Sequence, residues 1–183
     1  MPTEKEILDR CLKNDPLAQE LLFRKFGPKM YGICLRYVRN KAEASDILQE
    51  GFIKVFSKLN NFRGDGSFEG WVQRIFVNTA INHYRSNLHY DNDHIEAGDV
   101  DFVENEALSK LHTEELLTLI NELPDGYRMV FNLYEIEGFD HKQIAGMLGI
   151  SETTSRSQLL RAKKSLQEKL RKRYNISCYE HTA

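Results

Sequence analysis

The segment from Asp140 to Arg173 constrains the fold of this 183-residue chain more than any other part of it. Asp140 followed three residues later by Gln143 is a capping-box pattern, which starts a short helix. Gly149 supplies the left-handed backbone conformation that ends a helix, and Ser151 can cap another helix directly afterwards. The segment therefore predicts two helices joined by a tight turn.

The second of these helices separates its side chains into two faces. Apolar side chains recur on one face at helical spacing, at Leu159, Ala162, Leu166 and Leu170. The opposite face and its flanks carry hydroxyls and cations, at Thr153, Thr154, Arg156, Ser157, Arg161 and Lys164. Hydroxyls can reach base edges, and cations can neutralise phosphates. The pattern predicts a helix-turn-helix that binds DNA. The alternative is a solvated basic helix at the end of a bundle, which a basic run alone would favour.

Composition excludes several other classes. The net charge is -2, and the apolar share of 41% and charged share of 28% are ordinary for a soluble globular protein. No apolar run approaches the roughly 20 residues of a membrane span, and the N-terminus lacks an apolar signal core. We therefore expect a cytoplasmic protein without membrane insertion.

Metal, disulfide and enzyme chemistry are not expected either. The three cysteines, Cys11, Cys34 and Cys178, form no C-x-x-C pair, and the six histidines show no ligand spacing. Cys11 and Cys34 are expected to be small apolar fillers, and Cys178 a tail residue. No pair of groups has catalytic spacing, so we expect neither an enzyme nor a cofactor.

Helical periodicity dominates the chain and strand signals are weak, which predicts an all-α protein. Asp15-Pro16 is a helix start, Gly27-Pro28 is expected to break or kink that helix, and Asn40 is expected to cap the next one. Residues 87–106 carry seven acids and no Lys or Arg. This predicts a flexible acidic linker between two small helical domains, with an acidic loop inside one domain as the alternative.

The predicted helix over residues 45–59 has a polar side with one apolar residue. Asp46 and Glu50 fall on that side with Ile47 among them, and Gln49 flanks it. An exposed isoleucine between carboxylates indicates a protein-binding face. From the pattern alone, a surface helix with one incidental isoleucine is the better interpretation.

The predicted helix over residues 67–88 is apolar nearly all round, which is typical of a helix buried between neighbours. Arg74, Asn78 and Arg85 nevertheless line up in one polar stripe. Such a stripe can hold single-stranded nucleic acid, and hydrogen bonding inside a bundle explains it equally well. The glycine-containing loop before this helix carries Phe62, beside which an unstacked base can be accepted.

Together these segments resemble an extracytoplasmic-function (ECF) sigma factor, a small bacterial RNA polymerase initiation factor of the sigma-70 family. The resemblance rests on ASDILQEGFIKVF (44–56), FEGWVQRIFVN (68–78), LPDGYRMVFNL (123–133), IAGMLGIS (144–151) and SQLLRA (157–162). Each motif is degenerate alone, but their order and spacing are specific. The resemblance as a whole covers nearly the entire chain except the linker and the last ten residues.

The resemblance implies four segments: a sigma region 2 domain over 1–88, a linker over 89–106, a region 4 helix-turn-helix domain over 107–175, and a tail over 176–183. In region 2 it implies contacts with core polymerase by Asp46, Gln49 and Glu50. It also implies recognition and melting of the minus-ten element, for which the candidates are Phe62, Arg74, Asn78 and Arg85.

In region 4 the resemblance implies that the basic helix reads the minus-thirty-five element through Thr153, Thr154, Arg156, Ser157, Arg161 and Lys164. Ser155 departs from the family pattern, because an apolar residue is usual at this inward position. The implied partners are core RNA polymerase, promoter DNA and an anti-sigma factor. The alternative function is a two-domain helix-turn-helix regulator that acts without core polymerase.

Overall fold

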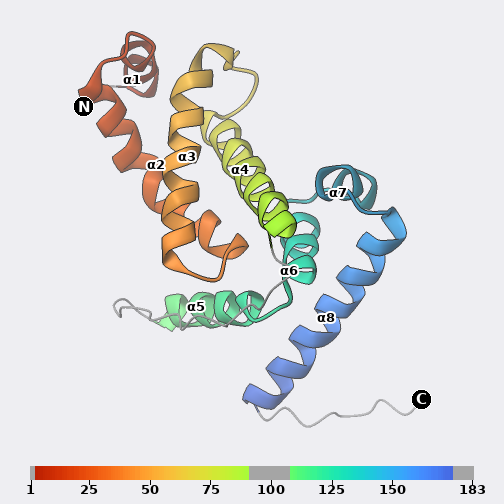
Figure 1. The fold of residues 1–183 in the computed structure, drawn as a ribbon. Coiled ribbons are helices and arrows are strands. Elements are labelled where there is room, and N and C mark those ends of the chain that lie inside the picture. The colour runs from red at the N-terminus through yellow and green to blue at the C-terminus, as the bar shows by residue number, and fades with distance from the viewer. Residues whose placement is uncertain (1–2, 91–107, 175–183) are drawn as a thin grey trace. The chain divides into compact units, whose positions relative to one another are not determined.

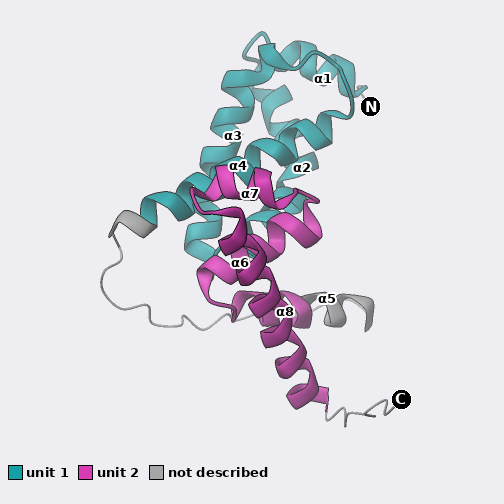
Figure 2. Ribbon diagram, turned by 90° about the vertical axis from the view of Figure 1, so that its right-hand side faces the viewer, with its two compact units in different colours: residues 1–100 teal, residues 101–183 magenta. Residues whose placement is uncertain are grey.

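The structure, a computed structural model, describes residues 3–90 and 108–174. Every regular element in this part of the chain is a helix, which confirms the all-α prediction. Contacts divide the chain into two compact units, residues 1–100 and 101–183 (Figure 2). The division falls inside the predicted linker, most of which lies outside the described residues, as does the predicted tail. No described helix is long and apolar enough to cross a membrane.

Unit 1 is a helical bundle whose elements are α1 (Glu4–Cys11), α2 (Pro16–Tyr37), α3 (Lys41–Lys58), the short 3-10 turn η1 (Leu59–Asn61) and α4 (Phe68–Tyr90) (Figure 1). Helices α2, α3 and α4 pack against one another, and α1 packs against α2. Their shared core includes the fully buried Leu22, Met30, Ile47, Val55, Val72 and Phe76. Helix α4 is buried against two neighbours, as its nearly continuous apolar surface predicts.

Helix α2 continues through Gly27-Pro28, so the predicted break does not occur. Proline lacks the N–H that would bond to the carbonyl four residues earlier, which usually kinks or ends a helix. Pro28 lies on the exposed side of α2, where water can bond to the freed carbonyl. Buried residues on both sides of it hold the helix together, namely Leu22, Phe26, Met30 and Ile33.

Helix α3 begins as predicted but does not expose Ile47. Asn40 caps the helix by accepting the backbone N–H of Glu43 at 2.8 Å. Ile47 is fully buried, and Ile53, 68% exposed, is the outward-facing isoleucine instead. Because α3 packs against both α2 and α4, its buried arc is wide enough to include Ile47.

Unit 2 contains α5 (Leu108–Asn121), α6 (Asp125–Phe131), the π-helical turn η2 (Asn132–Ile136), α7 (His141–Leu148) and α8 (Glu152–Tyr174) (Figure 1). Helix α8 packs against α5, α6 and α7. One core cluster joins α8 to the end of α5 through Leu119, Ile120, Leu123, Ala162 and Leu166.

A buried arginine ties α5 to α6. Arg128 Nη1 donates to the carbonyls of Asn121 and Leu123, each at 3.3 Å, and Nη2 lies 2.8 Å from Asp125 Oδ1. The guanidinium thus binds carbonyls at and just beyond the end of α5, where the last carbonyls of a helix have no intrahelical partner.

The two described cysteines are buried and free, in agreement with a role as apolar fillers. Burial raises the pKa of the Cys34 thiol to about 12, so this thiol stays protonated and unreactive at neutral pH. Cys178 lies outside the described residues.

Candidate nucleic-acid interfaces

Helices α7 and α8 form the predicted helix-turn-helix. The Asp140 side chain accepts the N–H of Gln143 at 2.7 Å, and Gln143 Oε1 accepts the N–H of Asp140 at 3.0 Å, which completes the capping box. Gly149 ends α7 with φ 70°, in the left-handed region. Ser151 Oγ accepts the N–H of Thr154 at 3.0 Å and so caps α8. Local sequence rules thus predict this motif correctly.

The inward face of α8 contains a polar contact in place of an apolar one. Ser155 is fully buried, and its Oγ lies 2.9 Å from His141 Nδ1. The imidazole of His141 stacks on the ring of Tyr134, with centroids 4.5 Å apart and an interplanar angle of 20°. The departure at Ser155 is therefore accommodated by a hydrogen bond that joins α8 to the start of α7.

Most candidate residues of α8 lie on its outward face. Exposed side chains belong to Thr153, Arg156, Ser157, Arg161 and Lys164. Thr154 is half-buried, and its hydroxyl lies 2.8 Å from Ser151 Oγ, so it supports the cap. Arg161 Nη1 donates to Tyr127 Oη at 3.4 Å, which orients the guanidinium.

Four of the eight cations between Arg156 and Arg173 pair with acids inside unit 2. The pairs are Arg156 with Glu152 at 3.6 Å, Lys163 with Glu135 at 2.7 Å, Lys169 with Glu122, and Arg173 with Glu115 at 3.9 Å. Within the described ranges, Arg161 and Lys164 form no ion pair. The strength of the positive field on α8 is therefore smaller than its composition indicates.

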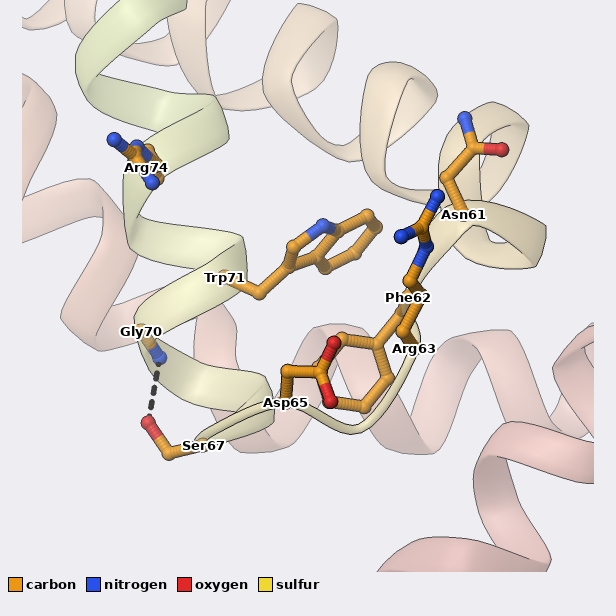
Figure 3. Close-up of a pocket in the computed structure, with 8 residues that line it drawn as sticks. All are labelled: Asn61, Phe62, Arg63, Asp65, Ser67, Gly70, Trp71 and Arg74. Carbon is orange, nitrogen blue, oxygen red and sulfur yellow. Dashed lines mark hydrogen bonds between the residues drawn. The ribbon is translucent and has the colours of Figure 1, made fainter.

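In unit 1, the loop between α3 and α4 forms one wall of a pocket of about 380 Å³. Figure 3 shows the side chains from this loop and the start of α4 around the Trp71 indole. The lining residues are Asn61, Phe62, Arg63, Asp65, Ser67, Gly70, Trp71 and Arg74. Two aromatic faces, two cations, one carboxylate and short polar groups together suit a planar, hydrogen-bonding ligand such as a nucleobase.

Aromatic contacts hold this loop in place. The Phe62 ring centroid lies 5.2 Å from that of Phe68 and 5.5 Å from that of Trp71. Gly64 and Gly66 adopt φ values of 79° and 109°, which favour glycine and let the loop turn sharply. Phe62 is accordingly half-buried, so the loop has a fixed end at Phe62 and an exposed turn beyond it.

The polar stripe on α4 is exposed at Arg74, Asn78 and Arg85. Of the three, only Arg74 lines the pocket with Phe62, while the other two lie further along the helix. Trp71 was not predicted as a site residue, because it belongs to the nearly continuous apolar surface that predicted a buried helix over residues 67–88. Its indole is half-buried and stacks on the ring of Phe68, with centroids 5.6 Å apart.

The candidate polymerase-binding residues Asp46, Gln49 and Glu50 are all exposed on α3. Glu50 pairs with Lys54 at 2.6 Å. Ile53 lies one turn beyond Gln49 and Glu50 on the same face, so an apolar residue does stand beside the carboxylates. Ile53 follows Asp46 by seven residues, or two helical turns, and this spacing in the sequence could have identified it as part of the same face. Among the described residues, no three His, Cys, Asp or Glu side chains are grouped so as to hold a metal ion.

The fold and these surfaces define a two-unit helical protein with a helix-turn-helix in its second unit. The family described as Sigma-70 region 2 matches residues 22–89, and Sigma-70, region 4 matches residues 113–166. The RNA polymerase sigma-H factor of Pseudomonas aeruginosa is 33% identical over 181 residues, covering 91% of this chain and 93% of that protein. This chain therefore belongs to the sigma-70 family of RNA polymerase sigma factors, in its ECF group.

Other relatives agree with this assignment. The ECF RNA polymerase sigma-E factor of Haemophilus influenzae is 30% identical, covering 92% of this chain and 95% of that protein. A solved structure of the sigma factor RpoE from Bartonella quintana, in complex with the anti-sigma factor NepR, has a TM-score of 0.55. It is 20% identical and covers 83% of this chain and 96% of that one, so it supports the fold.

Proposed function

We propose that this chain binds core RNA polymerase, recognises promoter DNA with both of its units, and opens the minus-ten region so that transcription starts. The observation that carries the proposal is the presence, in one sigma-70 family chain, of a helix-turn-helix and an aromatic pocket with a cationic rim. Strand opening needs no catalytic group, because capture of an unstacked base shifts the equilibrium toward open DNA. The site of action is the polymerase, in the cytoplasm.

The outward face of α3 is the proposed polymerase-binding surface. Asp46, Gln49 and Glu50 supply charge and hydrogen bonds that select a complementary surface, and Ile53 supplies apolar contact area. Asp46→Arg reverses one charge at an exposed position, so it should weaken capture by core polymerase in a pull-down. Asp9→Arg makes the same change at an exposed position on α1 and serves as the matched control.

The pocket beside Phe62 is the proposed site for a minus-ten base. A base that leaves the duplex stack can lie against the rings of Phe62 and Trp71 while Arg74 holds a neighbouring phosphate. Asn78 and Arg85 extend the contact along α4. Arg74→Ala should reduce permanganate reactivity of minus-ten thymines, because fewer complexes hold the strands apart. Core binding should remain unchanged.

The outward face of α8 is the proposed reader of the minus-thirty-five element. Thr153 and Ser157 can reach base edges from the first turns, and Arg156, Arg161 and Lys164 can contact phosphates. Thr154 supports the helix cap and thereby positions this surface. Arg161→Ala should weaken binding to double-stranded upstream DNA and spare core binding. Arg24→Ala in unit 1 is a control that removes an exposed arginine elsewhere.

An anti-sigma factor is the proposed regulatory partner. The Bartonella quintana structure is of a sigma factor in complex with an anti-sigma factor, and this chain shares its fold. A partner that covered the α3 face or the outward face of α8 would prevent assembly with polymerase or promoter.

The decisive experiment is transcription in vitro from genomic fragments by core polymerase, with and without this protein. New initiation sites that require both components are expected. If start sites are the same in both reactions, the proposed function is wrong. The alternative, a regulator acting without polymerase, predicts that the protein alone protects a symmetric DNA site.

A further inference from the structure

Leu160 on α8 is a large hydrophobic side chain that is 70% exposed. It follows Leu159, which is buried in the unit 2 core, so the two adjacent leucines point in different directions. At about 100° per residue, Leu160 lies within about 60° of Thr153, Ser157 and Lys164 around the helix axis. It therefore belongs to the outward face of α8.

The surroundings of Leu160 indicate which kind of partner covers it. The hydroxyls of Thr153 and Ser157 lie on its N-terminal side, and cations lie on both sides, at Arg156 four residues before and Lys164 four residues after. A surface of this kind complements duplex DNA, whose phosphates bind the cations. An acidic protein surface would satisfy the charges but would not require hydroxyls directed at base edges.

The major groove of DNA offers one apolar group to such a residue, the C5-methyl group of thymine. Leu160 shares the outward face of α8 with Thr153 and Ser157, the two hydroxyls proposed to reach base edges, so it faces the same groove. Ser157 is one turn earlier and Lys164 one turn later, so the three side chains follow the groove along the helix.

We propose that Leu160 recognises a thymine in the upstream promoter element through its methyl group. The inference rests on the proposed function of α8 and adds a residue that determines which sequence is preferred. Arg161 and Lys164 hold the helix on any duplex, whereas Leu160 discriminates between thymine and bases that lack the methyl group.

The test replaces each thymine of the upstream element, one at a time, by uracil, which removes the methyl group and leaves the hydrogen-bonding edge unchanged. Binding by the full-length protein with core polymerase is measured on a promoter found by transcription in vitro. At one thymine, uracil should weaken wild-type binding about fourfold, the loss expected for one methyl group removed from an apolar contact.

The Leu160→Ala protein should bind the thymine promoter more weakly than the wild type does. It should bind the uracil promoter as strongly as it binds the thymine promoter. Lys164→Ala is the matched control, because it should weaken binding to both DNAs alike and reduce the salt dependence. Circular dichroism of each variant checks that α8 is intact, which the exposure of both side chains leads us to expect.

Two results would overturn the inference and leave the proposed function standing. One is that the protein initiates from the promoter, but replacing any single thymine of the upstream element by uracil leaves binding unchanged. The other is a Leu160→Ala variant that loses polymerase or anti-sigma binding while keeping the preference for thymine, which would assign Leu160 to a protein contact. Failure to initiate from any promoter would instead refute the proposed function, and the inference with it.

Discussion

Gly51 on α3 faces the ring of Phe76 on α4, and its replacement by alanine tests how tightly unit 1 is packed. A Cβ at Gly51 would lie 2.3 Å from Cε1, 2.6 Å from Cζ and 2.7 Å from Cδ1 of Phe76. Phe76 is fully buried, and its ring packs edge-on against Phe52 with centroids 5.3 Å apart. The ring therefore cannot move aside without disturbing its neighbours.

Two effects of opposite sign set the magnitude. Alanine is a better helix former than glycine by about 1 kcal/mol. Overpacking of a well-packed core costs about 1–3 kcal/mol, and contact with three ring atoms puts Gly51→Ala at the upper end of that range. The free energy of unfolding of unit 1 should therefore fall by about 1–2 kcal/mol.

The assay uses the single tryptophan of the chain, Trp71, which lies in unit 1. Urea unfolding followed by tryptophan fluorescence reports on unit 1 and is not confused by unfolding of unit 2. Phe76→Leu shortens the obstructing ring, so Gly51→Ala should cost less in that background. A Gly51→Ala protein as stable as the wild type, or more stable, would refute the packing argument.

Three further predictions concern other buried or capping groups. Arg128→Met removes a buried guanidinium that contacts the Asp125 carboxylate and two carbonyls, and it should lower the stability of unit 2 by about 3 kcal/mol, measured by circular dichroism, with the fluorescence transition unchanged. The hydrogen bond from Arg10, together with backbone N–H donors, lowers the pKa of Asp15, so its carboxylate stabilises the fold at neutral pH and this contribution disappears as the pH falls below about 4. Asp15→Asn should therefore be less stable than wild type in urea unfolding at pH 7 and equal to it at low pH. Ser155→Ala and His141→Phe should each weaken upstream-DNA binding, and the double variant should be no worse than either, because each single change removes the same hydrogen bond.

Short-range rules were sufficient to predict the helix-turn-helix. A capping box, a left-handed glycine and a serine cap are each decided within four residues, so the turn at Gly149 follows from the sequence alone. The inward leucine stripe of α8 follows from periodicity in the same way. These predictions hold because no distant contact competes with them.

Predictions that depended on distant neighbours were wrong or incomplete. Ile47 is buried because two helices cover α3, and no local pattern reports how many neighbours a helix has. Pro28 remains inside α2 because packing on both sides outweighs one lost hydrogen bond. Trp71 belongs to a pocket only because the loop before α4 folds back toward it. The partner of Ser155, His141, lies fourteen residues away and carried no signal of its own.

The charge of α8 shows how structure changes an argument from composition. Eight cations would indicate an affinity for DNA dominated by phosphate contacts and strongly weakened by salt. Since half of them are paired with acids of unit 2, fewer phosphates can be neutralised, and free protein should bind upstream DNA weakly. Tethering to polymerase and to a second DNA-binding unit raises the effective concentration of α8 at a promoter that has both elements. Weak, sequence-sensitive contacts then favour the correct promoter more than strong, nonspecific ones would.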